Sequence, residues 1–166
     1  MGTRNYLLEG VSCAGKTTVA IELQQRGHDV VHGDRELAYQ GDPVTGEPRS
    51  GARHEHHVWD VDRVRELVAD DTAPVTWFCG GSRNHARFVD LFDEVFVLEL
   101  DRATLLQRLD ARPSDEYGAS PAEREVVLRT YDTRADLPAG TPVDATRPLD
   151  EVVDDLLRRT GQASAK

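Results

Sequence analysis

The sequence is poor in cysteine, in aromatic side chains and in long apolar runs. Its 166 residues include 2 cysteines, Cys13 and Cys79, and 6% aromatic residues. Two cysteines are too few for a disulfide framework or a four-thiolate zinc site, and no apolar run approaches the roughly 20 residues that span a bilayer. The first residues lack the apolar segment and cleavage site of a signal peptide. These absences predict a reduced, cytoplasmic protein that has no membrane partner.

Basic residues are also scarce, since 20 Lys and Arg against 30 Asp and Glu give a net charge of −10. General nucleic-acid binders neutralise phosphates with Lys and Arg, so this balance argues against a nucleic-acid partner. A local basic cleft is still compatible with it, because net charge describes the whole surface. The length suits one domain, which we expect over residues 1–160, with a flexible tail over 161–166. The sequence does not indicate an oligomeric state.

Short apolar runs alternate with segments of helical periodicity. Strands are predicted at 6–8, 30–33, 75–79, 95–100 and 142–143. Helices are predicted after the first strand as far as residue 26, over 58–71, after Asp101, from Ser120 and from Leu149. Asp101 and Ser120 are the expected N-caps, and Ser120-Pro-Ala-Glu123 has the spacing of a capping box. Such alternation favours a parallel sheet covered by helices on both faces.

The segment from Gly10 to Thr17 matches the phosphate-binding pattern G-x-x-x-x-G-K-[ST], known as the Walker A motif or P-loop. Its glycines let backbone N–H groups turn toward phosphate oxygens. Lys16 places a cation near the β and γ phosphates, and Thr17 offers a hydroxyl to Mg²⁺. The motif follows a predicted strand and opens a predicted helix, whose positive end faces the same anion. It predicts ATP and Mg²⁺ as cofactors, and we assign to the nucleotide Gly10, Ser12, Cys13, Ala14, Gly15, Lys16, Thr17 and Thr18.

With this motif near its N-terminus, the chain resembles the small P-loop kinases. These form the nucleoside-monophosphate-kinase-like group, which includes gluconate, shikimate and adenylylsulfate kinases. The resemblance covers nearly the whole chain. It implies a three-layer α/β P-loop NTPase fold with a parallel five-stranded sheet, helices on both faces and a short helical lid over about 108–124. It also implies an acceptor-binding arm over about 34–72.

The second predicted strand ends in His32-Gly33-Asp34-Arg35. The resemblance implies that Asp34 contacts the acceptor hydroxyl or the metal, so Asp34 is the candidate base and Mg²⁺ ligand, and Arg35 is a candidate substrate-binding residue. A physical argument agrees, since ligands bind at the carboxyl edge of a parallel sheet and a carboxylate there can orient an attacking hydroxyl. Alternatively, Asp34 caps a helix over 36–39. The two roles are compatible.

The third predicted strand ends in Cys79-Gly80, without the acidic residue that usually closes a Walker B strand. This leaves open which acidic residue anchors the metal, and gives more weight to Thr17 and Asp34. In the loop that follows, the resemblance implies that Arg83 binds substrate, where it could grip an anionic acceptor group. A solvated arginine in a turn is the alternative.

Arg108 and Arg112 are four residues apart, about one helical turn, and so share a helix face. The resemblance places both in the lid. It implies that Arg108 lies over the adenine and that Arg112 neutralises the transferring phosphoryl group as a catalytic residue. Alternatively, they belong to an ordinary helix face and pair with nearby aspartates.

The run His54-Glu55-His56-His57 lacks a defined zinc signature. We interpret it as the solvated start of the helix predicted from Val58, with a place for His54 or His57 in the acceptor pocket as the alternative. Tyr39 and Trp59 could stack on a substrate ring, although core positions are more typical of such aromatics.

These features together predict an enzyme, a small-molecule kinase. It would be an ATP- and Mg²⁺-dependent phosphotransferase that moves the γ-phosphoryl group of ATP to a hydroxyl or phosphate of a small molecule. One alternative is a nucleoside or nucleoside-monophosphate kinase, in which Arg83 clamps a phosphate. Another is a nucleotide-binding ATPase or switch with no small-molecule acceptor. The identity of the acceptor is not legible in the sequence.

Overall fold

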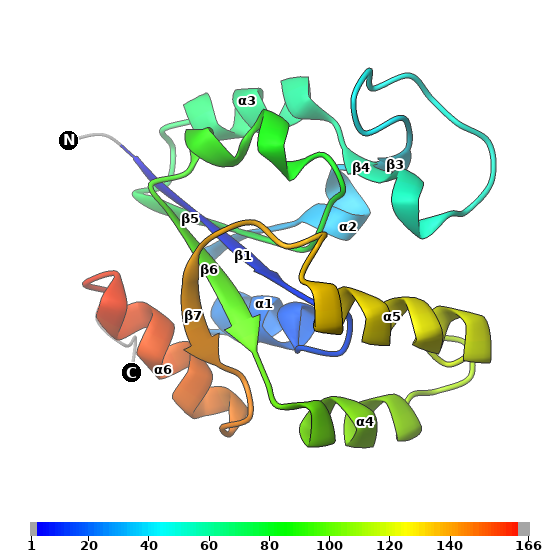
Figure 1. Ribbon diagram of the computed structural model, residues 1–166. Helices are drawn as coiled ribbons and strands as arrows, with labels where there is room; N and C mark the ends of the chain where they lie inside the picture. The colour runs from blue at the N-terminus through cyan, green and yellow to red at the C-terminus, as the bar shows by residue number, and fades with distance from the viewer. Residues whose placement is uncertain (1–2, 163–166) are drawn as a thin grey trace.

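A five-stranded sheet lies at the centre of the computed structural model, which describes residues 3–162 (Figure 1). Its strands are β1 (Arg4–Gly10), β2 (Asp29–His32), β5 (Val75–Cys79), β6 (Glu94–Glu99) and β7 (Thr141–Asp144). They lie in the order β2-β5-β1-β6-β7, and every neighbouring pair is parallel. The predicted parallel sheet is confirmed. The strand that precedes the phosphate-binding motif is the central one.

Helices cover both faces of the sheet (Figure 1). They are α1 (Lys16–Gln25), α2 (Gly33–Glu36), α3 (Val61–Ala69), α4 (Arg102–Asp110), α5 (Pro121–Thr133) and α6 (Leu149–Arg159). Successive side chains of a strand point to opposite faces, so Tyr6 and Leu8 pack in one core cluster with residues of α1 and α6, whereas Leu7 packs in another with Val61 and Val64 of α3. The predicted three-layer fold is confirmed.

The expected N-caps of two helices are present. The Asp101 side chain accepts a hydrogen bond from the Thr104 amide at 2.7 Å, and the Ser120 hydroxyl accepts one from the Glu123 amide at 3.2 Å. The Glu123 carboxylate accepts from the Gly118 amide at 3.2 Å. Two side-chain hydrogen bonds, one accepted by Ser120 and one by Glu123, therefore stabilise the start of α5.

The histidine-rich segment differs from its prediction. His54–His56 is one turn of 3-10 helix, and His57–Trp59 forms strand β4, which pairs antiparallel with β3 (Ala38–Gln40). The prediction of a helix from Val58 was therefore wrong for residues 58–60. Val58 lies three residues before Val61 and so fits the helical pattern by coincidence, whereas the helix begins only after Asp60, whose side chain accepts from the Arg63 amide.

The same hairpin corrects the prediction of a helix over 36–39. The short helix α2 is Gly33–Glu36, and Tyr39 lies in β3. Asp34 is therefore inside the helix and is not its N-cap. Trp59 is 1% exposed and stacks on Phe88 with ring centroids 5.4 Å apart, so it is a core residue.

The last described residues close helix α6. The Gln162 amide donates to the Leu157 carbonyl at 2.8 Å, and the rest of the expected tail, residues 163–166, lies outside the described part of the chain. Within residues 3–162, no helix is both long enough and apolar enough to cross a membrane. Cys13 and Cys79 are both free thiols.

We predict that Ser120→Ala destabilises the protein. The substitution leaves an amide at the start of α5 without its side-chain acceptor, and losing such a cap lowers the free energy of unfolding by about 1 kcal/mol. Chemical denaturation of the two proteins measures the difference. Ser114→Ala, at an exposed turn of the same segment, is the matched control and should leave the midpoint unchanged.

Candidate active site

The phosphate-binding motif forms the turn between β1 and α1, at the carboxyl edge of the sheet. Gly15 caps the helix with φ of 104°, a left-handed conformation that favours glycine. Gly10 lies against the neighbouring strand, where an added Cβ would be 3.2 Å from the Leu98 carbonyl oxygen. The Lys16 ammonium curls back and donates to the Gly10 carbonyl. The loop thus has the compact form that its sequence predicts.

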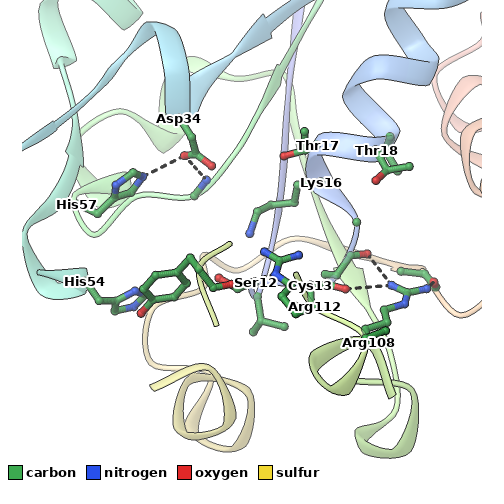
Figure 2. A pocket seen from close by; sticks show the side chains of 18 of the residues that line it. Ser12, Cys13, Lys16, Thr17, Thr18, Asp34, His54, His57, Arg108 and Arg112 are labelled. Carbon is green, nitrogen blue, oxygen red and sulfur yellow. Dashed lines mark hydrogen bonds and ion pairs between the residues drawn. The ribbon is translucent and has the colours of Figure 1, made fainter. Parts of the chain in front are cut away.

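One cavity of about 660 Å³ extends from this loop to Asp34, His54 and His57 (Figure 2). Its lining includes the nucleotide candidates from Ser12 to Thr18, together with Asp34, Arg83, Arg108 and Arg112. Gly10 and Arg35 are not among the lining residues, and Arg35 is exposed. Residues from four separate segments of the sequence therefore meet around one space.

Arg108 fastens the phosphate-binding loop to the segment after β7. Its guanidinium donates to the carbonyls of Cys13 at 3.1 Å, Ala14 at 3.2 Å and Ala145 at 2.7 Å. These acceptors are backbone oxygens, not the carboxylates of an ordinary surface pair. Arg108 therefore forms one wall of the cavity beside the loop, as Figure 2 shows.

Arg112 is held within the segment that connects α4 to α5. Its Nε donates to the Tyr117 carbonyl at 2.9 Å, and its Nη1 lies 3.4 Å from the Glu116 carboxylate. Because these partners are local, Arg112 faces the cavity without a partner from the phosphate-binding loop in the contacts recorded for residues 3–162.

Asp34 also lines the cavity, and 47% of its side chain is exposed. Its Oδ1 accepts hydrogen bonds from His57 Nε2 at 3.0 Å and from the Gly81 amide at 3.4 Å (Figure 2). Burial acts to raise the pKa of Asp34, but the hydrogen bond from His57 and the charge of Lys16 outweigh it, so the pKa lies below its usual value. Asp34 is therefore ionised at neutral pH.

His57 reaches Asp34 because β4 is tied to the loop that follows β5. The Arg83 amide donates to the His57 carbonyl at 2.8 Å. The buried side chain of Asn84 accepts from the Trp59 amide at 3.0 Å and donates to the Trp59 carbonyl at 2.9 Å. As a result, His54 and His57 both line the cavity. This position is compatible with the alternative in which one of these histidines contacts a substrate.

Arg83 belongs to a cluster that sequence analysis did not assemble. Its Nη1 lies 2.8 Å from the Asp136 carboxylate and 2.8 Å from His54 Nε2, and His54 stacks on Tyr117 with ring centroids 6.1 Å apart. Burial lowers the pKa of His54. With the ring neutral, His54 Nε2 accepts a hydrogen bond from the guanidinium of Arg83, which can only donate. The same Nε2 atom lies 3.0 Å from the Asp136 carboxylate. Arg83 is therefore an ion-paired side chain, not a solvated turn residue.

Glu9 is a buried acidic residue beside the cavity that the sequence did not single out. It is 1% exposed, and its carboxylate accepts from the Gly10 amide at 3.1 Å and the Ser82 amide at 3.4 Å. Burial raises its pKa to about 7 against the opposing charges of Lys16 and Arg83. The first strand is predicted only over 6–8, and the acidic residue that follows this apolar run is the signal that could have pointed to Glu9.

We predict that Glu9 makes stability depend on pH. The folded state holds the Glu9 proton more tightly than the unfolded chain does, so the free energy of unfolding falls as the pH rises from about 4.5 to about 7. Glu9→Gln removes this titration. The free energy of unfolding of the variant minus that of the wild type should therefore rise by up to about 3 kcal/mol from about pH 4.5 to about pH 7. A loss of hydrogen bonding in the variant shifts this difference equally at every pH and does not change the rise.

Denaturation curves at several pH values measure this difference. Glu125→Gln, on the exposed face of α5, is the matched control. A constant difference between Glu9→Gln and wild type across the range would contradict the prediction.

Comparisons with known proteins agree with the fold. The model of the family described as AAA domain matches residues 7–129. A solved sugar kinase from Janibacter sp. HTCC2649 is 19% identical with a TM-score of 0.59, covering 98% of this chain and 97% of that one. No curated protein sequence matches the chain.

Two further solved structures are similar. Shikimate kinase from Aquifex aeolicus is 18% identical with a TM-score of 0.52, covering 95% of this chain and 96% of that one. A gluconokinase from Sinorhizobium meliloti 1021 is 19% identical with a TM-score of 0.53, covering 93% and 90%. The predicted resemblance to small P-loop kinases is confirmed at the level of the fold. The chain belongs to the AAA domain family.

Proposed function

We propose that the protein is a small-molecule kinase that transfers the γ-phosphoryl group of ATP to a hydroxyl group, with Mg²⁺. The observation that carries this proposal is the single cavity that contains both the phosphate-binding loop and the ionised Asp34. A nucleotide bound at the loop would have its terminal phosphate directed toward a carboxylate that can receive an alcohol. An ATPase or switch would need no such second half.

The nucleotide would occupy the half of the cavity that the phosphate-binding loop lines. Lys16 and the amides at the start of α1 would hold the β and γ phosphates. Arg108 already braces the loop through three backbone carbonyls, and the adenine would lie beside its guanidinium. Arg112 would neutralise the charge that spreads over the transferring group.

The donor set suits Mg²⁺. The Thr17 hydroxyl and the Asp34 carboxylate both line the cavity and are exposed, and Mg²⁺ is typically held by one or two such oxygens together with substrate phosphates and water. The ion would screen the charge of the phosphates.

The acceptor hydroxyl would lie beside Asp34. Its oxygen would attack the γ-phosphorus in line with the β–γ bridging oxygen. The bond between the γ-phosphorus and this bridging oxygen would break and release ADP, and the hydroxyl proton would pass to Asp34. His57 keeps the carboxylate in place through its hydrogen bond. The low pKa of Asp34 keeps it unprotonated before the reaction.

The surrounding segments would act as parts of one domain. The arm over about 34–72 contains the β3–β4 hairpin and supplies His54 and His57 to the acceptor side. The segment over about 108–124 contains Arg112 and Tyr117 and would serve as the lid. Two free thiols suit the cytoplasm as the working compartment.

We predict that Lys16→Ala severely lowers the rate of phosphoryl transfer while the domain stays folded. The variant lacks the cation beside the β and γ phosphates, and removing one such transition-state contact costs about 10²–10³ in kcat. The assay incubates the protein with ATP, Mg²⁺ and a pool of alcohols and seeks the mass gain of one phosphoryl group. Near-wild-type transfer by the folded variant would exclude Lys16 from the reaction.

We also predict that Asp34→Asn lowers kcat by about 10²–10⁴ and weakens ATP binding much less. The amide cannot take the proton but keeps the size of the side chain. Asp62→Asn, at a side chain that is 91% exposed on α3, is the matched control. ATP hydrolysis without any phosphorylated product across the pool would defeat the kinase proposal.

A further inference from the structure

We propose that the acceptor is an uncharged, polyhydroxylated alcohol, and that Asp136 enforces this choice by neutralising Arg83. The inference rests on the proposed kinase function and adds to it the chemical class of the acceptor. It follows from how the charged side chains of the acceptor half are already paired.

Arg83 is the buried cation of this half, and it is already engaged. Its side chain is 11% exposed, and Nη1 contacts both the Asp136 carboxylate and His54 Nε2 at 2.8 Å. A phosphate or carboxylate of an acceptor would have to displace Asp136 to gain Arg83. Breaking a largely buried ion pair leaves a charge uncompensated, which costs much more than breaking a surface pair.

The pair is also anchored from several elements. Asp136, which follows α5, accepts from the Thr130 hydroxyl at 3.3 Å. His54 comes from the arm and stacks on Tyr117 of the lid segment. Because four segments hold Arg83 and Asp136 together, the guanidinium is a fixed structural charge in this site.

The other cations that line the cavity have different roles. Arg53 lies at the rim with 70% of its side chain exposed, 3.4 Å from Glu55, so water screens its charge. Lys16 is committed to the nucleotide phosphates by its place in the loop. The described lining also includes Arg108, which backbone carbonyls hold, Arg112, which the Tyr117 carbonyl holds and which is assigned to the transferring group, and Arg147, which lies 3.5 Å from Glu151.

The remaining groups of this half suit hydroxyls. The Asp34 carboxylate lines the cavity and can accept a hydrogen bond from an alcohol. His54, His57, Gln40 and Tyr117 line the same wall and offer polar atoms of both kinds. A molecule with several hydroxyl groups can both donate to and accept from such a wall without a change in charge.

The first test compares three classes of acceptor with the wild-type protein, ATP and Mg²⁺. Neutral polyols such as glucitol and inositol stand against sugar acids such as gluconate and against sugar and nucleoside monophosphates. We expect kcat/KM for the best neutral acceptor to exceed that of the best anion by roughly tenfold or more. A preference for an anion would overturn the inference and leave the kinase function standing. Phosphorylation of no acceptor in any class would overturn the proposed function itself.

The second test is Asp136→Asn, which removes the charge and keeps an oxygen near Arg83. Freeing the guanidinium should raise the ratio of anionic to neutral kcat/KM by roughly tenfold or more, chiefly through a lower KM for the anion. Asp132→Asn is the matched control, because Asp132 is an exposed partner of Arg102 on the same helix as Thr130. A ratio that does not change in a folded Asp136→Asn protein would overturn the role of Asp136. The wild-type comparison of acceptor classes does not depend on the folding of the variant.

Discussion

The positions of His54 and His57 on the cavity wall depend on the hydrogen bonds by which Asn84 and the Arg83 amide hold strand β4. Asn84 is 2% exposed and bonds both backbone groups of Trp59, while the Arg83 amide bonds the His57 carbonyl. Buried backbone groups must be paired, so these bonds fix the hairpin against the end of β5. Because the backbone of the hairpin is fixed in this way, His57 lies within hydrogen-bond distance of Asp34, and His54 lies within hydrogen-bond distance of Arg83.

Glu9 links the loop after β5 to the phosphate-binding loop. Its carboxylate accepts from amides on both sides, Gly10 in the phosphate-binding loop and Ser82 after β5. A buried carboxyl is tolerated only with such partners, and its raised pKa shows that burial outweighs the nearby cations. The phosphate-binding loop and the loop after β5, which both supply lining residues to the cavity, are therefore joined by one side chain at the end of the central strand.

The parts of the structure that were predictable from the sequence are those with local causes. The strands, the caps at Asp101 and Ser120, and the phosphate-binding loop follow from periodicity, from short spacings and from glycine conformation. The hairpin was missed because Val58 mimics a helical repeat that strand pairing overrides. The partners of Asp34 and Arg83 could not be found, because His57 is 23 residues from Asp34 and Asp136 is 53 residues from Arg83. Only the packing of the arm and the segment after α5 brings them together.

The acidic composition and the cationic cleft follow one physical rule. A net charge of −10 is tolerated because most carboxylates are exposed to solvent, whereas each cation of the cleft is held by specific oxygens. Backbone carbonyls hold Arg108, and a carboxylate holds Arg83. A guanidinium bonded to neutral carbonyls keeps its full charge for a phosphate, while one paired with a carboxylate does not. The surroundings of Arg108 and Arg83 therefore differ in electrostatic character, and under the proposed function this difference would direct the nucleotide to one side of the cavity and a neutral alcohol to the other.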